Sequence, residues 1–334
     1  MSPLSLVMYL KKVTIAIFSY LPSEGKIFFY RCMGAKIGKN VELGFGSIII
    51  PQDFDFKKII IENGVIIGDG VQILSKHLFI GEQSQIKNFT TIWGQSDFNM
   101  GRSAYIDQHC FFDLRNDISI GNFVGIGGGS WFYTHGILHS ILEGWPSKFG
   151  PIKIGDRSWI AANTFLLPGI SIGENVIVES RSVVTRNVQS DSVVMGYPAR
   201  EITKTSKIVR RLNVEEKAMI IRKIIFEFIN RNPETTVLKK DENDRIVFEF
   251  RRFTIIFTPA ININDFTREV FREYGNNFVV LSFDIPEETI QLLNSRGIAW
   301  FDFGQNTQSI KRIKPALKLS TFFGNYAIAM DTRD

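Results

Sequence analysis

Cysteine is scarce in this chain of 334 residues, which holds only Cys32 and Cys110. Two cysteines cannot form a disulfide framework or a cluster of metal ligands, so both are expected to be buried, small apolar residues in a reducing compartment. Low-complexity segments are absent, and no basic stretch is interleaved with aromatic residues in the manner typical of nucleic-acid binding. The sequence therefore predicts a folded protein with no metal and no nucleic-acid partner.

Long apolar runs are missing as well. The N-terminal segment 1–30 is apolar, but Lys11 and Lys12 interrupt it, so it is too short to span a bilayer. Its charges lie within the apolar run rather than ahead of it, unlike those of a secretory signal. We predict an amphipathic helical segment over residues 1–30 that covers the next domain, with peripheral membrane association as the alternative. The expected location is the cytoplasm, with the inner face of the membrane as the second option.

The charge balance is mildly basic, since 39 Lys and Arg residues against 34 Asp and Glu residues give a net charge of +5. Such a surface suits an anionic partner, for example CoA phosphates, an acidic glycan or a membrane, and is equally typical of a solvated basic face. The chain is also longer than one ordinary hydrophobic core requires, which favours two domains.

A six-residue period runs through residues 31–204. Typical units are I-G-K-N-V-E from Ile37, I-G-D-G-V-Q from Ile67 and I-G-E-N-V-I from Ile172. Aliphatic side chains at every sixth position can stack in successive coils, while Gly and Asn supply tight corners. An α-helix would need an apolar spacing of about 3.6 and ordinary strands would alternate by two. The pattern therefore predicts a parallel β-helix.

The period breaks off before Pro151 for about twenty residues, and this gap holds two of the four histidines. Motifs follow the gap: I-G-D-x-x-W-I from Ile154, P-G-I-x-I-G from Pro168, S-V-V-T-R from Ser182 and G-x-P-A-R from Gly196. With them the chain resembles the hexapeptide-repeat acyltransferases, especially the O-acetyltransferases of sugars and cell-surface polysaccharides related to maltose and galactoside acetyltransferase. The resemblance covers roughly residues 30–204. It implies a left-handed β-helix with three six-residue units per coil, a homotrimer and acetyl-CoA as co-substrate.

The resemblance also implies a catalytic base. In this family a loop that leaves the helix wall carries the catalytic histidine, and His135 stands at the family's usual distance before Pro151. An imidazole that titrates near neutral pH can take the proton of a sugar hydroxyl as it attacks a thioester. The family position for an orienting Asn is Asp107 here, Asp113 is the second candidate, and each is equally compatible with a simple turn role. Candidates for substrate binding are Asp107, His109 and His139.

The CoA site follows from the same resemblance. Trp159 aligns with the tryptophan beside the acyl and pantetheine groove, and Ala162 and Ser180 align with positions whose backbone groups bond the pantetheine amides. Arg181 replaces a family glycine, and it either adds a phosphate contact or points to solvent. Guanidinium groups suit phosphate. The segment that would meet the adenine and the phosphates contains Thr185, Arg186 and Arg200.

The six-residue pattern ends before residue 205, and residues 205–334 predict a smaller α/β domain. Asn213 is the expected N-cap of a helix over residues 213–230. Two strands, 245–251 and 253–259, precede an alternation of helix 263–275, strand 277–283, helix 285–297 and strand 298–303, which predicts parallel pairing. No catalytic motif appears, so acceptor recognition, docking to a glycan-assembly partner and oligomer packing all stay open.

Taken together, these features predict an acetyl-CoA-dependent O-acetyltransferase that acts on a sugar hydroxyl of a bacterial cell-surface polysaccharide or its precursor. Sugar N-acylation on the same scaffold and a catalytically silent β-helix are the alternatives. A zinc hydratase of the γ-carbonic anhydrase type needs three converging histidines. The spacing of the histidines here does not resemble that arrangement.

Overall fold

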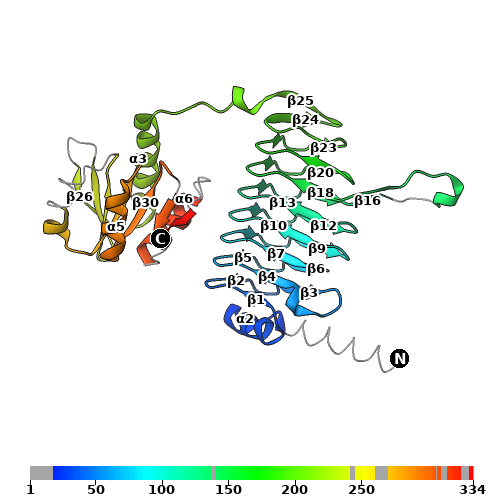
Figure 1. Cartoon of the computed structure of the whole chain (residues 1–334), viewed down its shortest axis with the longest axis horizontal. Coiled ribbons are helices and arrows are strands. Elements are labelled where there is room, and N and C mark those ends of the chain that lie inside the picture. Colours follow the sequence, from blue (N-terminus) through cyan, green and yellow to red (C-terminus); the bar gives the residue numbers. More distant parts are fainter. Residues whose placement is uncertain are drawn as a thin grey trace. The chain divides into compact units, whose positions relative to one another are not determined.

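The computed structural model describes residues 18–136, 140–240, 245–259, 270–305, 307–309, 314–324 and 331–333. The chain separates into two compact units, residues 1–210 and 211–334. The first unit is a parallel β-helix and the second is an α/β unit (Figure 1). The predicted fold class, a mainly β left-handed β-helix with a smaller α/β domain after it, is confirmed.

Three sheets form the walls of the β-helix, and each coil contributes one strand to each sheet. The first sheet contains β1 (Lys36–Ile37), β4 (Ile59–Ile61), β7 (Leu78–Ile80), β10 (Phe98–Met100), β13 (Ile118–Ile120), β18 (Ile152–Ile154) and β21 (Ser171–Ile172). The second contains β2 (Glu42–Leu43), β5 (Ile66–Ile67), β8 (Gln85–Ile86), β11 (Tyr105–Ile106), β14 (Gly125–Ile126), β19 (Trp159–Ile160), β22 (Ile177–Val178), β24 (Ser192–Gly196) and β25 (Ala199–Lys204). The third contains β3 (Ile48–Pro51), β6 (Gln72–Ser75), β9 (Thr91–Gly94), β12 (Phe111–Leu114), β15 (Trp131–Tyr133), β20 (Phe165–Leu166) and β23 (Val183–Val184).

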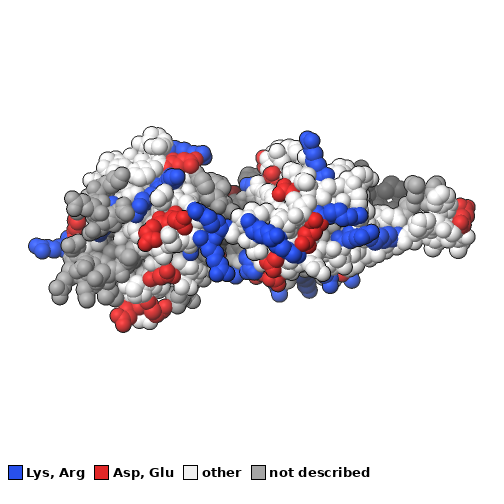
Figure 2. All heavy atoms as spheres, turned by 90° about the horizontal axis from the view of Figure 1, so that it is seen from above, with Lys and Arg blue, Asp and Glu red and all other residues white. Residues whose placement is uncertain are grey.

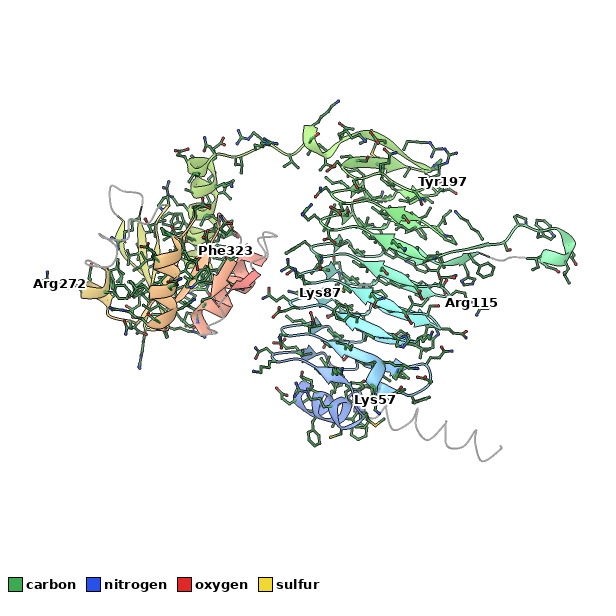
Figure 3. The ribbon with its side chains drawn as sticks, viewed as in Figure 1. Lys57, Lys87, Arg115, Tyr197, Arg272 and Phe323 are labelled. Atoms are coloured by element: carbon green, nitrogen blue, oxygen red, sulfur yellow. The ribbon has the colours of Figure 1, made fainter. Side chains whose placement is uncertain are left out.

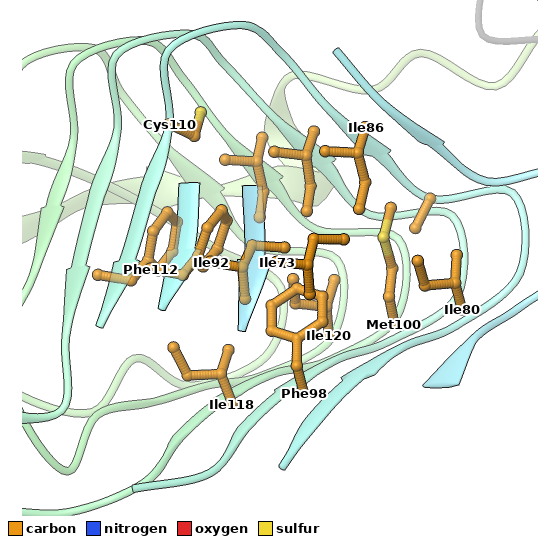
Figure 4. Close-up of a cluster of buried hydrophobic side chains, with 14 of the residues drawn as sticks. Ile73, Ile80, Ile86, Ile92, Phe98, Met100, Cys110, Phe112, Ile118 and Ile120 are labelled. Atoms are coloured by element: carbon orange, nitrogen blue, oxygen red, sulfur yellow. The ribbon is translucent and has the colours of Figure 1, made fainter. Parts of the chain in front are cut away.

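Aliphatic side chains stack along the axis, as the period predicts, and Figure 4 shows this interior. One buried column of the first sheet consists of Ile61, Ile80, Met100, Ile120, Ile154 and Ile172. Each buried aliphatic side chain contributes about 1.5–3 kcal/mol. Coil length varies: Phe98 pairs with Ile118, twenty residues on, whereas Lys153 pairs with Ser171, eighteen residues on. Only the shorter coils therefore equal three six-residue units.

Hydroxyl side chains fill the corner between the second and third sheets. The Ser130 hydroxyl donates to the carbonyl of Gly127, and the Thr164 hydroxyl to that of Ala161, both at 2.7 Å. Both hydroxyl residues are fully buried, so these bonds satisfy polar groups that would otherwise be unpaired. The preceding residue has positive φ, which is 58° at Asn163, and Asn tolerates this conformation well. These contacts explain the small fifth residue of these two units and the Gly129 and Asn163 at their fourth positions.

Helix α2 (Ser23–Cys32) closes the N-terminal end of the β-helix, where no earlier coil among the described residues bonds the first one. The Lys26 amine donates to the carbonyl of Gly44 and, at 3.2 Å, to the hydroxyl of Ser47. The Ile49 N–H donates to the Tyr30 hydroxyl at 3.0 Å. Lys26 is buried, and this burial lowers the pKa of its amine. Most of the predicted helical segment 1–30, namely residues 1–17, lies outside the described residues.

The two cysteines differ in exposure. Cys110 is buried in the β-helix, and burial raises the pKa of its thiol to about 11. Cys32 is exposed, so the prediction that both cysteines are buried is wrong for Cys32. It lies at the end of α2, whose buried side chains are those of Lys26 and Tyr30. Among the described residues, no helix is long and apolar enough to cross a membrane.

The second unit is a seven-stranded mixed sheet with helices. Its strands, in spatial order, are β26 (Thr235–Lys240), β27 (Ile246–Phe250), β28 (Phe253–Phe257), β29 (Phe278–Ser282), β30 (Ala299–Asp302), β31 (Thr307–Ser309) and β32 (Asp331–Arg333). Its helices are α3 (Val214–Arg231), α5 (Glu287–Ser295) and α6 (Lys314–Gly324). Strands β28, β29 and β30 pair in parallel, as predicted, and β27 pairs antiparallel with β28. Asn213 caps α3 through a reciprocal pair of bonds with Glu216. The predicted helix 263–275 lies mostly outside the described residues.

Candidate active site

An arm interrupts the β-helix between β15 and β18, where the six-residue period breaks off (Figure 1). Its base is a two-stranded antiparallel ribbon of β16 (His135–Gly136) and β17 (Lys148–Phe149). A short 3-10 helix, η2 (Ile141–Glu143), lies between them. His135 is the first residue of the ribbon, so its side chain stands at the wall of the β-helix. The predicted substrate-binding residue His139 lies outside the described residues.

His135 forms a pair with Asp113, which lies in β12 of the neighbouring coil. The Nδ1 atom of His135 is 2.5 Å from Oδ2 of Asp113, and the two side chains are 40% and 14% exposed. An ionised carboxylate only accepts hydrogen bonds, so Nδ1 of the neutral imidazole donates. This tautomer leaves the lone pair of Nε2 available to accept a proton. The pair therefore has the chemistry of a general base with an orienting partner.

The contacts around the pair fix its geometry. The Thr134 N–H donates to Oδ2 of Asp113 at 3.3 Å, and the Thr134 hydroxyl donates to the Asp113 carbonyl at 2.8 Å. The N–H of Asn116 donates to that hydroxyl at 2.9 Å. The ring of Phe149 stacks on that of His135 with centroids 6.4 Å apart and planes at 22°. The carboxylate is thus held from the strand side and the imidazole from the arm side.

Asp107, the first candidate for the orienting partner, lies elsewhere. It follows β11 at a corner between the second and third sheets. Its Oδ1 accepts from the Tyr105 hydroxyl at 3.1 Å and from the Gln108 N–H at 2.8 Å. Burial and the nearby Asp107 carboxylate raise the pKa of Tyr105 to about 12. The structure brings Asp113 to His135, and it gives Asp107 a contact with Tyr105.

His109 occupies the same corner as Asp107 and does not join the His135 pair. Its backbone has a φ of 58°, and its ring stacks on Phe89 of the previous coil at 5.4 Å. The structure forms a second histidine–aspartate pair that the sequence did not predict. Nδ1 of His77 lies 2.7 Å from Oδ1 of Asp97. Neither residue belongs to a recognisable motif, so only the coil length could have suggested that they meet.

Four of the predicted CoA residues, Trp159, Ala162, Ser180 and Arg181, lie on the second sheet or at its corner with the third. Trp159 projects from β19 and is 45% exposed. A side chain at Gly125, in the preceding coil, would meet the Trp159 ring at 2.3 Å, so only glycine leaves room for this ring. Ala162 and Ser180 lie at successive corners, where the Arg181 N–H donates to the Ala162 carbonyl at 3.0 Å. That carbonyl is therefore already engaged in the wall of the β-helix.

The cationic residues of this set lie toward the C-terminal end of the β-helix. Arg181 has a φ of 60° at its corner, and Arg200 lies in β25. Thr185 and Arg186 follow β23 directly. The guanidinium groups of Arg181, Arg186 and Arg200 belong to exposed residues. Figure 2, which looks onto this end, shows basic and acidic side chains interspersed over its surface.

The two edges of the β-helix lie near different candidate residues. Arg115, just after β12, and Tyr197, in the β24–β25 hairpin, lie on the edge from which the arm projects, whereas Lys87 lies on the opposite edge (Figure 3). The Nζ atom of Lys87 is 5.7 Å from the centroid of the Tyr105 ring. Lys87 therefore belongs to the Asp107 corner rather than to the His135 pair. Among the described residues, no group of three His, Cys, Asp or Glu side chains is arranged to hold a metal ion.

Comparison with known proteins gives a consistent result for the β-helix. The family model described as bacterial transferase hexapeptide (six repeats) matches residues 151–186. A candidate acetyltransferase of Staphylococcus aureus (strain MRSA252) is 34% identical over 119 residues, which cover 35% of this chain and 59% of that protein. A chloramphenicol acetyltransferase of Klebsiella aerogenes is 29% identical over 151 residues, covering 36% of this chain and 70% of that protein.

Among solved structures, the maltose O-acetyltransferase of Clostridium difficile 630 has a TM-score of 0.33 and 23% identity, covering 59% of this chain and 84% of that one. The chain spans 59% of the length of the first curated relative that it matches. The matched residues 151–186 begin where the chain re-enters the β-helix after the arm. Residues 151–186 of the β-helix thus match bacterial transferase hexapeptide repeats, and the chain resembles the hexapeptide-repeat acetyltransferases.

Proposed function

We propose that this chain is an acetyl-CoA-dependent O-acetyltransferase that modifies a sugar hydroxyl of a bacterial cell-surface polysaccharide or its precursor. The single observation that carries the proposal is the His135–Asp113 pair at the base of the arm, 2.5 Å apart and partly exposed. The hexapeptide repeats of residues 151–186 support the acyltransferase class. The name of the maltose O-acetyltransferase supports the choice of a sugar.

The chemistry follows from the tautomer of His135. Nε2 takes the proton of the acceptor hydroxyl while the hydroxyl oxygen attacks the thioester carbonyl carbon. The carbonyl oxygen becomes an oxyanion, which backbone N–H groups of the wall can stabilise. When the intermediate collapses, the C–S bond breaks and the imidazolium returns its proton to the leaving thiolate. Asp113 stabilises the positive imidazolium during this cycle, because it supplies a fixed negative charge at Nδ1.

Two alternatives use the same scaffold. Sugar N-acylation would need the same base and differs only in the acceptor atom, so a panel of hydroxyl and amino sugars distinguishes the two. A catalytically silent β-helix has no need of an oriented imidazole. The bonds from Thr134 to Asp113 and the ring of Phe149 over His135 favour the enzyme.

We also propose that the complete site forms between copies of the chain in a homotrimer. His135 stands at the third sheet and Trp159 projects from the second, and the outer faces of two adjoining walls point in different directions. The arm carries strongly exposed apolar side chains, since Ile141 is 59% and Leu142 is 94% exposed. Exposed apolar groups of this kind gain stability when another surface covers them.

The phosphates of CoA would lie toward the C-terminal end, near Arg181, Arg186 and Arg200, because guanidinium groups bind phosphate in a bidentate manner. Trp159 would line the acyl and pantetheine groove. We further propose a cytoplasmic location with association at the inner face of the membrane. At the N-terminal end, Tyr20, Phe28 and Phe45 are 62%, 71% and 64% exposed, and aromatic side chains of this kind favour a membrane interface.

The proposed reaction is tested by thiol release from acetyl-CoA in the presence of hydroxyl sugars and amino sugars. We expect release with at least one hydroxyl sugar and its loss in His135→Ala. Equal rates in the variant would rule out His135 as the base, and transfer to amino sugars alone would establish N-acylation. A sedimentation experiment on the full chain tests the trimer, whose absence at assay concentration would contradict a shared site.

A further inference from the structure

The outer face of the third sheet carries a cluster of exposed and half-buried aromatic side chains. Alternate residues of each strand point outward, and on each of the four consecutive strands β9, β12, β15 and β20 at least one of them is aromatic. The rings of Phe111 and Trp131 lie 5.3 Å apart, and those of Trp131 and Phe165 lie 6.0 Å apart. Trp131 and Phe165 are 39% and 38% exposed. We call this surface the aromatic face, and its members are Trp93, Phe111, Trp131, Tyr133 and Phe165.

The aromatic face borders the candidate catalytic pair. Asp113 pairs directly with Trp93 on one side and with Tyr133 on the other. His135 follows Tyr133 by two residues, so its imidazole borders the same surface. Phe111, Trp131 and Phe165 follow one another in a single column of outward residues. The same column contains Gln72 and Thr91 before Phe111 and Val183 after Phe165, so its aromatic part is confined to these coils.

We propose that the aromatic face is the acceptor subsite and that it binds a glycan of several sugar units lying across the strands. This inference rests on the proposed function for the role of His135. A pyranose ring has an apolar face of C–H groups, which stacking on an aromatic ring removes from water, and hydroxyls at its edge that stay solvated. Neighbouring strands lie about 4.8 Å apart, so the aromatic residues on the four strands from β9 to β20 span roughly 14 Å. One sugar ring cannot cover that length.

The polar groups within the face favour a glycan over a second copy of the chain. The Asp113 side chain is 14% exposed and that of His135 is 40% exposed. Covering this pair with another protein surface would strip water from a charged carboxylate without replacing its hydrogen bonds. Sugar hydroxyls can supply those bonds, and one of them would lie at Nε2 of His135.

The test is direct binding of sugars to the full chain by titration calorimetry, with no acyl donor present. The probes are glucose, maltohexaose, cellohexaose and N-acetylated chitohexaose. We expect at least one hexasaccharide to bind more tightly than glucose, and Trp131→Ala to weaken that binding about tenfold, the loss of one stacking contact. Trp131→Phe keeps a ring at this position and should stay within about threefold of the unmodified chain.

Phe45→Ala is the matched control, because Phe45 is an exposed aromatic residue at the first coil. It should leave hexasaccharide binding unchanged. Failure of all three hexasaccharides to bind, or equal binding by Trp131→Ala, overturns the proposal. A loss of the oligomer in Trp131→Ala, measured by sedimentation, overturns it in favour of an interface between copies. Since no acetyl-CoA is used, these outcomes are independent of whether acetyl transfer is found.

Discussion

Two histidine–aspartate pairs lie where the β-helix turns from its third sheet to its first. The distance from Nδ1 to the carboxylate is 2.5 Å in His135–Asp113 and 2.7 Å in His77–Asp97. The two imidazoles are nearly equally exposed, at 40% and 43%. By side-chain type and distance alone, either pair could serve as a base with an orienting partner.

Their surroundings differ. Asp113 belongs to a strand and is 14% exposed, whereas Asp97 lies at the corner between β9 and β10 and is 32% exposed. Only His135 stands at the arm, where Phe149 stacks on its ring. A less solvated carboxylate interacts more strongly with an imidazolium, and a stacked ring restricts the imidazole. The comparison teaches that the arm and the burial of the acid, rather than the pair itself, distinguish the candidate active site.

The sharpest test of this comparison replaces each histidine. His135→Ala should lower kcat/KM for acetyl transfer by about 10²–10⁴-fold, because it removes the general base. His77→Ala should leave the rate within about twofold. The measurement is thiol release with the best acceptor. A large loss in the His77 variant would make the two pairs functionally equivalent.

Replacing the acids gives the next largest effect. Asp113→Asn should lower kcat on the order of 10²-fold, since the amide cannot stabilise the imidazolium and does not enforce the tautomer. Asp97→Asn serves as the matched control and should keep the activity. The split between kcat and KM separates the roles, because an orienting acid acts on the chemical step and leaves acceptor binding unchanged. A kcat in Asp113→Asn equal to that of the unmodified chain would mean that Asp113 only supports the fold.

A smaller effect is expected from the stacked ring. Phe149→Ala removes a contact worth about 1 kcal/mol, so the rate should fall roughly fivefold. Phe149→Leu retains apolar cover and should fall less. Steady-state kinetics at saturating acetyl-CoA measure this difference. A Phe149→Ala rate equal to that of the unmodified chain would show that the arm fixes His135 through its backbone alone.

The smallest effect concerns the neighbouring phenol. Burial and the Asp113 carboxylate raise the pKa of Tyr133 above its ordinary value. Asp113→Asn removes the negative charge, so this pKa should move down and remain elevated by burial, while Asp97→Asn should not move it. NMR titration of ¹³C-labelled tyrosine, assigned with Tyr133→Phe, follows the change. An upward shift would contradict the placement of Asp113 beside Tyr133.

The sequence predicts the walls of the β-helix better than its site. The period identifies the stacked aliphatic residues because each coil repeats the same environment. The period does not predict which of Asp107 and Asp113 contacts His135, because the arm that begins at His135 does not follow the six-residue repeat. The His77–Asp97 pair is missed for another reason: its members are twenty residues apart, which equals the longer coil, and the implied eighteen-residue coil does not bring them together.

In the second unit, sequence patterns predict the elements that are long and strongly patterned. The cap of α3 at Asn213 and the strands β27 to β30 belong to this group. The short strands β31 (Thr307–Ser309) and β32 (Asp331–Arg333) escape prediction. Two such strands carry too few residues for a period-two pattern, and their pairing is decided by the sheet that they join.

The closure of the first coil by α2 has a consequence for self-association. A β-helix that ended in an open coil would offer unpaired carbonyl and N–H groups to any similar edge. Such an edge invites end-to-end growth into fibres. By occupying the Gly44 carbonyl and the Ile49 N–H, the side chains of Lys26 and Tyr30 remove two of the groups that a second molecule would need to extend this end.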